Sequence, residues 1–169
     1  IAFKHTDGIV ILKAIKSSFI PRKMSSPSKS PCIFCNIVNN LEDTELLYED
    51  DIVCVFRDIK PASKYHILTV PKRHIVDAKA LTTNDKDLVE KMLTVAKEML
   101  SKNNYPIEDA RFGYHWPPFR SVKHLHLHTI APESEMGFLA RMIFKKDSYW
   151  FVSAFIYSLE SRVYNHNQI

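Results

Sequence analysis

Late in the chain, histidine and leucine alternate as His-Leu-His-Leu-His over residues 124–128. Alternate residues of a β-strand point to opposite faces of the sheet. This spacing predicts a strand that buries Leu125 and Leu127 in a core, while His124, His126 and His128 lie in a row on the other face. Any fold that this chain adopts must therefore contain a sheet with one face packed against a core.

Three histidines in strict alternation, in a chain with 8 histidines, indicate a functional site rather than a solvated surface. Imidazole changes its charge near pH 7, so it can act as a nucleophile, a proton carrier or a metal ligand. A metal held by all three rings is one alternative, although no clear acidic or water-holding residue accompanies them. Nucleophilic catalysis instead needs a histidine oriented by a hydrogen bond on its second nitrogen, and a nearby backbone carbonyl can supply it.

The remaining hydrophobic patterns predict an α+β fold. Apolar residues at helical spacing predict a short N-terminal helix over 32–38 and, after a run of capping residues at 82–85, one long helix from Leu88 to Leu100. A further helix is expected over 148–159. Strands are expected at 46–48, 52–56, 65–70, 110–115 and 123–131. The prediction is an antiparallel sheet of about five strands, crossed by the long helix.

Composition narrows the class of protein. With 46% hydrophobic and 25% charged residues, the 169-residue chain has the balance of one globular domain. It has no run near the roughly 18 apolar residues that a membrane span needs, so an integral membrane protein is excluded. Three cysteines, an odd number, argue against a secreted disulfide scaffold. The expected location is a reducing compartment, the cytoplasm or the nucleus.

The first 30 residues differ from the rest. They carry six basic residues and one acidic residue, Asp7, so their net charge is +5. Since the whole chain has a net charge of +4, residues 31–169 have a net charge of −1. We expect a disordered basic leader over 1–30. One interpretation is a mitochondrial transit peptide, and the other is translated upstream sequence before a start at Met24. The near-neutral remainder gives no charge-based reason to expect nucleic acid or a membrane surface as partner.

The segment from His124 to Ile130 resembles the signature of the histidine triad (HIT) superfamily of nucleotide hydrolases and transferases. Two other segments, residues 56–61 and 66–75, are similar to the nucleoside-gripping segment and the following strand of its Hint branch. The blocks at 113–119 and 148–151 resemble one subgroup of that branch. The resemblance implies a HIT-like domain over 31–133, followed by a partly helical C-terminal extension over 134–169.

This resemblance implies a hydrolase that releases AMP from adenosine 5′-phosphoramidates, or from acyl- and lysyl-adenylates, with no cofactor required for catalysis. His126 matches the nucleophile, which attacks the α-phosphorus and forms a nucleotidyl-histidine intermediate. His128 matches the residue that hydrogen-bonds the phosphate oxygens. His124 matches a residue that supports the strand and joins a proton relay, and His66 one near the leaving amine, which must be protonated as it departs.

The resemblance also implies the nucleotide contacts. Asp58 matches a carboxylate that accepts hydrogen bonds from the ribose hydroxyls, Ile59 packs against base or sugar, and Ser121 matches a hydroxyl on the phosphate. The loop before the triad departs from the Gly-rich family pattern, because Pro117–Pro118 removes backbone N–H donors. Arg120 is then either a charged donor that replaces them or a solvated side chain, and both alternatives stay open.

Cys32 and Cys35 form a Cys-x2-Cys pair that is weak evidence alone. Together with His74 and His124, they resemble the structural zinc ligands of some HIT superfamily members, a set suited to tetrahedral coordination. The alternative is a small buried cysteine pair that packs the N-terminal helix, with His74 as a surface residue.

Two other functions compete with the hydrolase. An altered loop before the triad favours a nucleotide-binding regulatory or scaffold protein with weak catalysis, whereas the intact triad with Asp58 and His66 opposes it. An aprataxin-like enzyme that removes AMP from DNA ends would need a basic surface, which residues 31–169 lack. The expected partners are therefore a purine nucleotide and a second copy of the chain, because family members are usually homodimers. The helix at 88–100 and the aromatic C-terminus are either dimer surfaces or intramolecular core.

Overall fold

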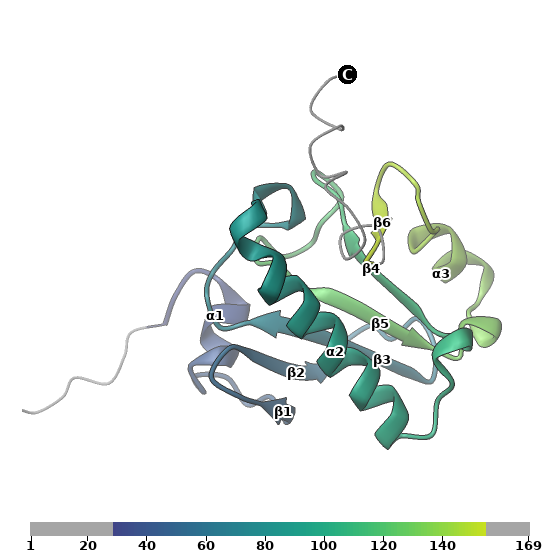
Figure 1. Cartoon of the computed structure of the whole chain (residues 1–169), viewed down its shortest axis with the longest axis horizontal. Helices are drawn as coiled ribbons and strands as arrows, with labels where there is room; N and C mark the ends of the chain where they lie inside the picture. The colour runs from purple at the N-terminus through teal and green to yellow at the C-terminus, as the bar shows by residue number, and fades with distance from the viewer. Residues whose placement is uncertain (1–28, 155–169) are drawn as a thin grey trace, which may run out of the picture.

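A computed structural model describes residues 29–154, which form a six-stranded antiparallel sheet crossed by one long helix (Figure 1). The expected leader lies outside these residues, apart from its last two. The strand order is β1-β2-β3-β5-β4-β6. The strands are β1 Leu46–Glu49, β2 Val53–Arg57, β3 Tyr65–Pro71, β4 Arg111–His115, β5 Leu127–Ala131 and β6 Phe151–Ser153. The helices are α1 Ile33–Val38, α2 Lys86–Lys102 and α3 Phe138–Ile143, with 3-10 turns at Ala78–Ala80, Thr83–Asp85, Ile107–Asp109 and Glu133–Glu135.

The long helix α2 confirms the prediction from apolar periodicity. A capping box precedes it, in which the Asp85 carboxylate accepts hydrogen bonds from the backbone N–H and the hydroxyl of Thr82 at 2.8 and 2.9 Å. Its apolar face packs on the same side of the sheet as Leu125 and Leu127. The buried residues are Val89, Met92, Leu93, Val95, Ala96, Met99 and Leu100. This face is therefore intramolecular core and is not available to a second copy.

The opposite face of the sheet carries α1 at one end. Phe34 and Ile37 of this helix pack against Cys54, Phe56 and Leu68. Residues 53–56 of β2 and all of β3 are buried, so these two strands are covered on both faces of the sheet. None of the described helices is both long and apolar enough to cross a membrane.

The structure corrects the sequence-based expectations at two strands. The helix predicted over 148–159 is wrong at residues 151–153, which form β6 beside β4, while residues 155–159 lie outside the described part. Gly113 of β4 makes this pairing close, because a Cβ there would lie 2.5 Å from the ring of Phe151. The sheet thus continues past residue 133. The strand expected over 123–131 begins only at Leu127, because Leu125 donates its N–H to Ile75, outside the ladder, at 2.6 Å.

Candidate active site

The three histidines of the motif are buried on the sheet face opposite α2, as the alternation predicts. Leu125 and Leu127 pack in the α2 core. The three rings have different neighbours. His124 turns its Nδ1 toward two cysteines, His126 contacts a backbone carbonyl and His128 contacts another imidazole.

The ring of His126 is oriented by the backbone of its own segment. Its Nδ1 lies 2.6 Å from the carbonyl oxygen of His124. A carbonyl oxygen only accepts hydrogen bonds, so Nδ1 carries the hydrogen and Nε2 keeps a free lone pair. Burial is the main cause that lowers the pKa of His126 to about 4, against a smaller raising effect of the His124 carbonyl. The ring is therefore neutral at pH 7 and keeps an Nε2 lone pair, which is the form that a base or a nucleophile requires.

His128 has the opposite tautomer, fixed by a chain of hydrogen bonds. The backbone N–H of Ala62 donates to His66 Nδ1 at 3.0 Å, so the hydrogen of neutral His66 is on Nε2. That Nε2 lies 2.9 Å from His128 Nδ1 and donates to it. The hydrogen of His128 is then on its own Nε2, a buried atom with no hydrogen-bond partner among the described residues. His126 thus offers a lone pair beside an N–H of His128, with 4.8 Å between ring centroids.

Burial also keeps these two rings neutral. It is the largest cause that lowers the pKa of His66 to about 4, although Asp58 partly opposes it. Burial, followed by His126 and His66, lowers the pKa of His128 well below its ordinary value. Near pH 7, His66 and His128 are therefore both neutral, and each carries its single ring hydrogen on Nε2.

A pocket of about 470 Å³ opens beside His126 and His128. This volume is within the usual range for small-molecule and cofactor sites. Three of the nucleotide contacts expected from the sequence, Asp58, Ile59 and Ser121, line its walls. The structure therefore brings five of the expected site residues to one cavity.

Three expected residues do not line this pocket, and one of them, His124, lies beside Cys32 and Cys35. His66 does not line the pocket, because it pairs opposite Ile130 and its ring lies behind His128. It contacts the His128 ring at the pocket wall, and its expected role near the leaving group stays a prediction. Arg120 is neither solvated nor in the pocket, since its Nη2 lies 3.0 Å from Asp77 Oδ2 and both side chains are largely buried.

Sequence reasoning missed His115. Its ring centroid lies 4.9 Å from that of His128, and its Nδ1 lies 3.2 Å from the carbonyl oxygen of Trp150. The register of β4 with β5 places Gly113 opposite His128, so His115, two residues on, shares that face. His115 could have been found only by knowing that β4 pairs with β5, and the sequence pattern does not predict which strands pair.

Asp58, His66 and His128 have donor atoms within 4.8 Å of one another, a spacing that also suits a metal ion. Coordination through His66 Nε2 would require the hydrogen on Nδ1, where it would face the N–H of Ala62. Two donors would then oppose each other. The group is better described as a hydrogen-bonded His66–His128 pair beside the Asp58 carboxylate, whose Oδ2 atom lies 3.5 Å from His66 Nε2.

Four other residues fit a structural zinc ion. The sulfurs of Cys32 and Cys35 and the Nδ1 atoms of His74 and His124 all lie within 4.8 Å of one another. Three sulfur–nitrogen pairs among them lie 3.1 to 3.5 Å apart, close to the edge of about 3.6 Å expected for tetrahedral zinc. His124 Nε2 donates to the carbonyl oxygen of Pro71 at 2.9 Å, which leaves the Nδ1 lone pair toward the sulfurs.

Comparisons with known proteins agree with this geometry. The family model described as "Scavenger mRNA decapping enzyme C-term binding" matches residues 31–143. The adenosine 5′-monophosphoramidase HINT3 of Xenopus tropicalis is 50% identical over 125 residues, which are 73% of this chain and 82% of that protein. HINT3 of Mus musculus is 48% identical over 128 residues, 73% of this chain and 77% of that protein. A solved histidine triad protein from Clostridium difficile is 30% identical, with a TM-score of 0.57 over 62% of this chain and 92% of that one.

These matches confirm the resemblance to the Hint branch, and the subgroup suggested by residues 113–119 and 148–151 is the one whose relatives are named HINT3. The family model covers most of the chain, and the Xenopus relative shares half of its aligned residues over most of both lengths. The chain therefore belongs to the family of the scavenger decapping enzyme C-terminal domain, and so to the histidine triad superfamily.

Proposed function

We propose that this chain hydrolyses adenosine 5′-phosphoramidates, and acyl- and lysyl-adenylates, to AMP through an intermediate bound to His126. The observation that carries the proposal is the pair of opposite tautomers at the pocket, a lone pair on His126 beside an N–H on His128. The names of the Xenopus and mouse relatives, adenosine 5′-monophosphoramidases, support the same reaction.

In the first step, His126 Nε2 attacks the α-phosphorus and the bond from phosphorus to the leaving amine breaks. The amine departs with the electron pair and takes a proton from a water molecule in the pocket, which leaves a hydroxide ion. His128, which lines the pocket, offers its Nε2–H to stabilise negative charge on the phosphoryl oxygens. His66 donates its Nε2–H to His128 Nδ1 at 2.9 Å and so keeps the His128 hydrogen on Nε2.

In the second step, a water molecule attacks phosphorus and the bond to His126 breaks. The water gives its proton to the hydroxide ion left by the first step, AMP is released and His126 returns to its neutral form. The covalent intermediate divides one difficult displacement into two easier ones. No metal or cofactor takes part in either step of this proposal.

The nucleoside half of the pocket supports a ribonucleotide as substrate. Asp58 uses one carboxylate oxygen on the N–H of Lys60 at 2.7 Å, and its remaining lone pairs can accept from ribose hydroxyls. Ile59 is 94% exposed at the rim, an apolar surface that a bound base would cover. Ser121 also lines the pocket wall. Arg120 has no part in this proposal, because its Nη2 is paired with Asp77 and it does not line this pocket.

The purified chain is expected to release AMP from adenosine 5′-phosphoramidate, measured by chromatography, without added cofactor. Replacement of Asp58 by asparagine should raise KM about 10-fold and change kcat far less, because a charged acceptor for the ribose hydroxyls is lost. The 2′-deoxy substrate gives a matched control. For wild type, KM for the deoxy substrate should be higher by a similar factor. For Asp58→Asn, the change to the deoxy substrate should raise KM little further. Equal discrimination against the deoxy substrate by both proteins would contradict the role of Asp58.

The same assay separates the competing functions. A scaffold protein would bind AMP without releasing it from any AMP conjugate at a measurable rate. An aprataxin-like enzyme would prefer adenylated DNA ends over the free phosphoramidate. Turnover of the phosphoramidate with little action on adenylated DNA is the result that we expect.

Two further expectations concern the protein in the cell. We propose a homodimer and a cytoplasmic or nuclear location. Since α2 uses its apolar face inside one chain, a dimer must form through other surfaces. Light scattering of the purified protein measures the first, and fluorescence microscopy of the tagged full chain measures the second.

We also propose that Cys32, Cys35, His74 and His124 hold a structural zinc ion. When bound, zinc would link the start of α1 to the loop after β3 and to the segment before β5. The free cysteines and the orientation of the His124 lone pair support this proposal. The ion would stabilise the region around His126 and is not expected to contact substrate.

A further inference from the structure

One aromatic side chain outside the sheet, Phe144, packs against the group of histidines from behind. Its ring centroid lies 5.3 Å from that of His66, 5.1 Å from that of His128 and 5.0 Å from that of His115. Phe144 is only 8% exposed, and it does not line the pocket. Three imidazoles therefore share one apolar neighbour on the side away from the substrate.

The ring lies in a buried cluster with Ile130, Met136 and Phe151, to which the preceding helix contributes only Ala140. No residue of α3 is buried, and the side chains of Phe138, Leu139 and Met142 are 81%, 69% and 51% exposed. A helix this short, with its large apolar side chains in water, gains little burial energy that could fix the residue after it.

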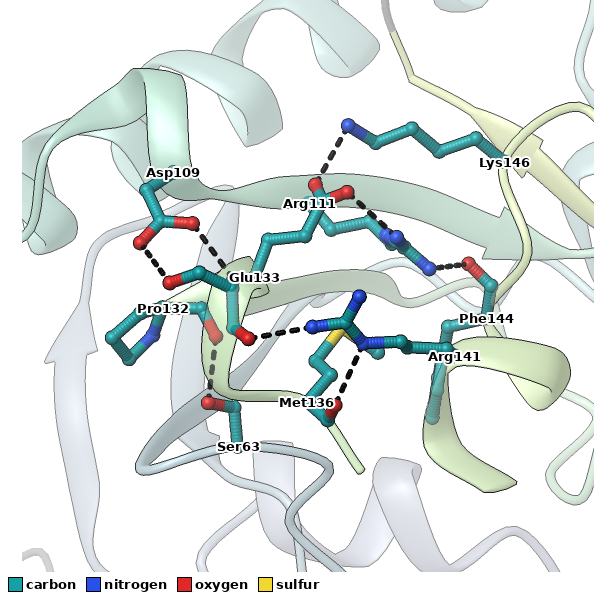
Figure 2. Close-up of polar contacts among 10 residues, drawn as sticks. Ser63, Asp109, Arg111, Pro132, Glu133, Met136, Arg141, Phe144 and Lys146 are labelled. Carbon is teal, nitrogen blue, oxygen red and sulfur yellow. Dashed lines mark hydrogen bonds and ion pairs between the residues drawn. The ribbon is translucent and has the colours of Figure 1, made fainter. Parts of the chain in front are cut away.

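Instead, a buried arginine of β4 holds the backbone of Phe144 (Figure 2). Arg111 Nη1 donates to the Phe144 carbonyl oxygen at 2.5 Å, and its Nη2 donates to Glu133 Oε1 at 2.7 Å. Lys146 lies 2.6 Å from the second carboxylate oxygen of Glu133. Charge-assisted bonds of this kind are among the strongest polar contacts in proteins, and a buried guanidinium cannot lose them cheaply.

A second arginine ties the same segment from the other side. Arg141 donates from Nε to the carbonyl oxygen of Met136 at 2.8 Å and from Nη2 to that of Ser134 at 2.6 Å (Figure 2). Ser134 in turn donates its N–H and its hydroxyl to Asp109. The segment that carries Phe144 is therefore fixed by polar bonds at several points.

We propose that Arg111 and Phe144 are positioning residues of the active site. Arg111 fixes the backbone of Phe144, and the ring of Phe144 keeps water away from the His66–His128 pair, so that His66 stays the donor to His128. The expected effect on activity rests on the proposed hydrolase function. The expected effect on the His66–His128 hydrogen bond does not.

The groups around the His66–His128 pair determine how the entry of water would change the pKa of His66. Four titratable groups face His66. Asp58 follows the end of β2, and His115 belongs to β4. His128 belongs to β5, and His126 is the residue before β5. Among these groups only Asp58 raises the pKa of His66, while burial is the largest cause that lowers it. If water reached the pair, the pKa of His66 would rise from about 4 toward its ordinary value of 6.5.

A protonated His66 would disrupt the chain of hydrogen bonds. It would carry a hydrogen on Nδ1, opposite the N–H of Ala62, and two donors would face each other. Without the Phe144 ring, the His66–His128 hydrogen bond would then be lost in weakly acidic solution, whereas the wild type would keep it. Loss of the apolar cover should therefore harm activity on the acidic side and leave the alkaline side nearly unchanged.

The test uses the full chain labelled with ¹⁵N at histidine and follows the titration of His66 by long-range ¹H–¹⁵N NMR. In Phe144→Ala we expect the pKa of His66 to rise by about one unit or more. The acidic limb of the kcat/KM profile for adenosine 5′-phosphoramidate should move up by a similar amount, with values within about threefold of wild type at pH 8. Arg111→Met should shift both in the same direction.

Phe138→Ala is the matched control, because it removes an exposed phenylalanine of α3 and should leave the His66 titration unchanged. Phe144→Leu keeps an apolar cover and should restore most of the wild-type titration. An unchanged His66 titration in folded Phe144→Ala, or the same shift in Phe138→Ala, overturns the proposal. If Phe144→Ala does not fold, Arg111→Met decides alone. Since NMR needs no turnover, a failure of the hydrolase function would be recognised separately.

Discussion

Replacement of His126 by alanine should abolish AMP release and leave nucleotide binding intact. The variant loses the Nε2 lone pair that forms the covalent bond, so kcat for adenosine 5′-phosphoramidate should fall about 10⁴-fold or more. The pocket keeps Asp58, Ile59, Ser121 and the N–H of His128. The Kd for AMP, measured by calorimetry, should therefore change by less than about threefold.

His115→Gln is a suitable control for this result. It also removes an imidazole near His128, but one whose Nδ1 contacts the Trp150 carbonyl and which does not line the large pocket. We expect a loss in kcat below about 10-fold for this variant. Equal turnover by wild type and His126→Ala, or equal losses in the two variants, would show that His126 is not the nucleophile.

Removal of zinc should destabilise the protein strongly. Protein purified without a histidine tag should contain one zinc ion per chain, and chelation should lower the free energy of unfolding by about 3 kcal/mol. For a domain of this size, such a loss lowers Tm by about 10 °C in thermal unfolding. The effect would arise because the proposed ion would join Cys32 and Cys35, at the start of α1, to two segments that are distant in sequence.

The cysteines provide a matched pair of variants for the zinc site. Cys35→Ser should lower both the zinc content and Tm, whereas Cys54→Ala should keep the full zinc content, because Cys54 is buried in the sheet core. Less than about one tenth of a zinc ion per chain, with a Tm that does not respond to chelation, would rule out the site.

Local patterns were sufficient to predict most of the fold. The alternation at 124–128 requires one strand face to hold imidazoles and the other to hold leucines, and the structure has both. The long helix was predictable because its capping residues and its apolar period agree. Each of these features depends on neighbours within a few residues of sequence, which is the range that pattern reasoning covers.

The parts that were not predictable depend on contacts between distant segments. Phe151 becomes a strand residue because Gly113 leaves room for its ring, and no local pattern records that pairing. His66 lies behind His128 because of the β3–β5 register. Arg120 pairs with Asp77, which is 43 positions away in this sequence. In all three cases contacts between segments distant in sequence decided the outcome, and no local pattern contains them.

The most direct test of the account is mass spectrometry of the protein quenched during turnover of adenosine 5′-phosphoramidate. We expect a population of chains that carry one AMP moiety, acid-labile as a phosphorus–nitrogen bond should be, and located on His126 in the peptide that contains residues 124–128. The His126→Ala protein should carry none. An AMP moiety on any other residue, or rapid AMP release with no adduct at any quench time, would contradict a covalent nucleotidyl-His126 intermediate.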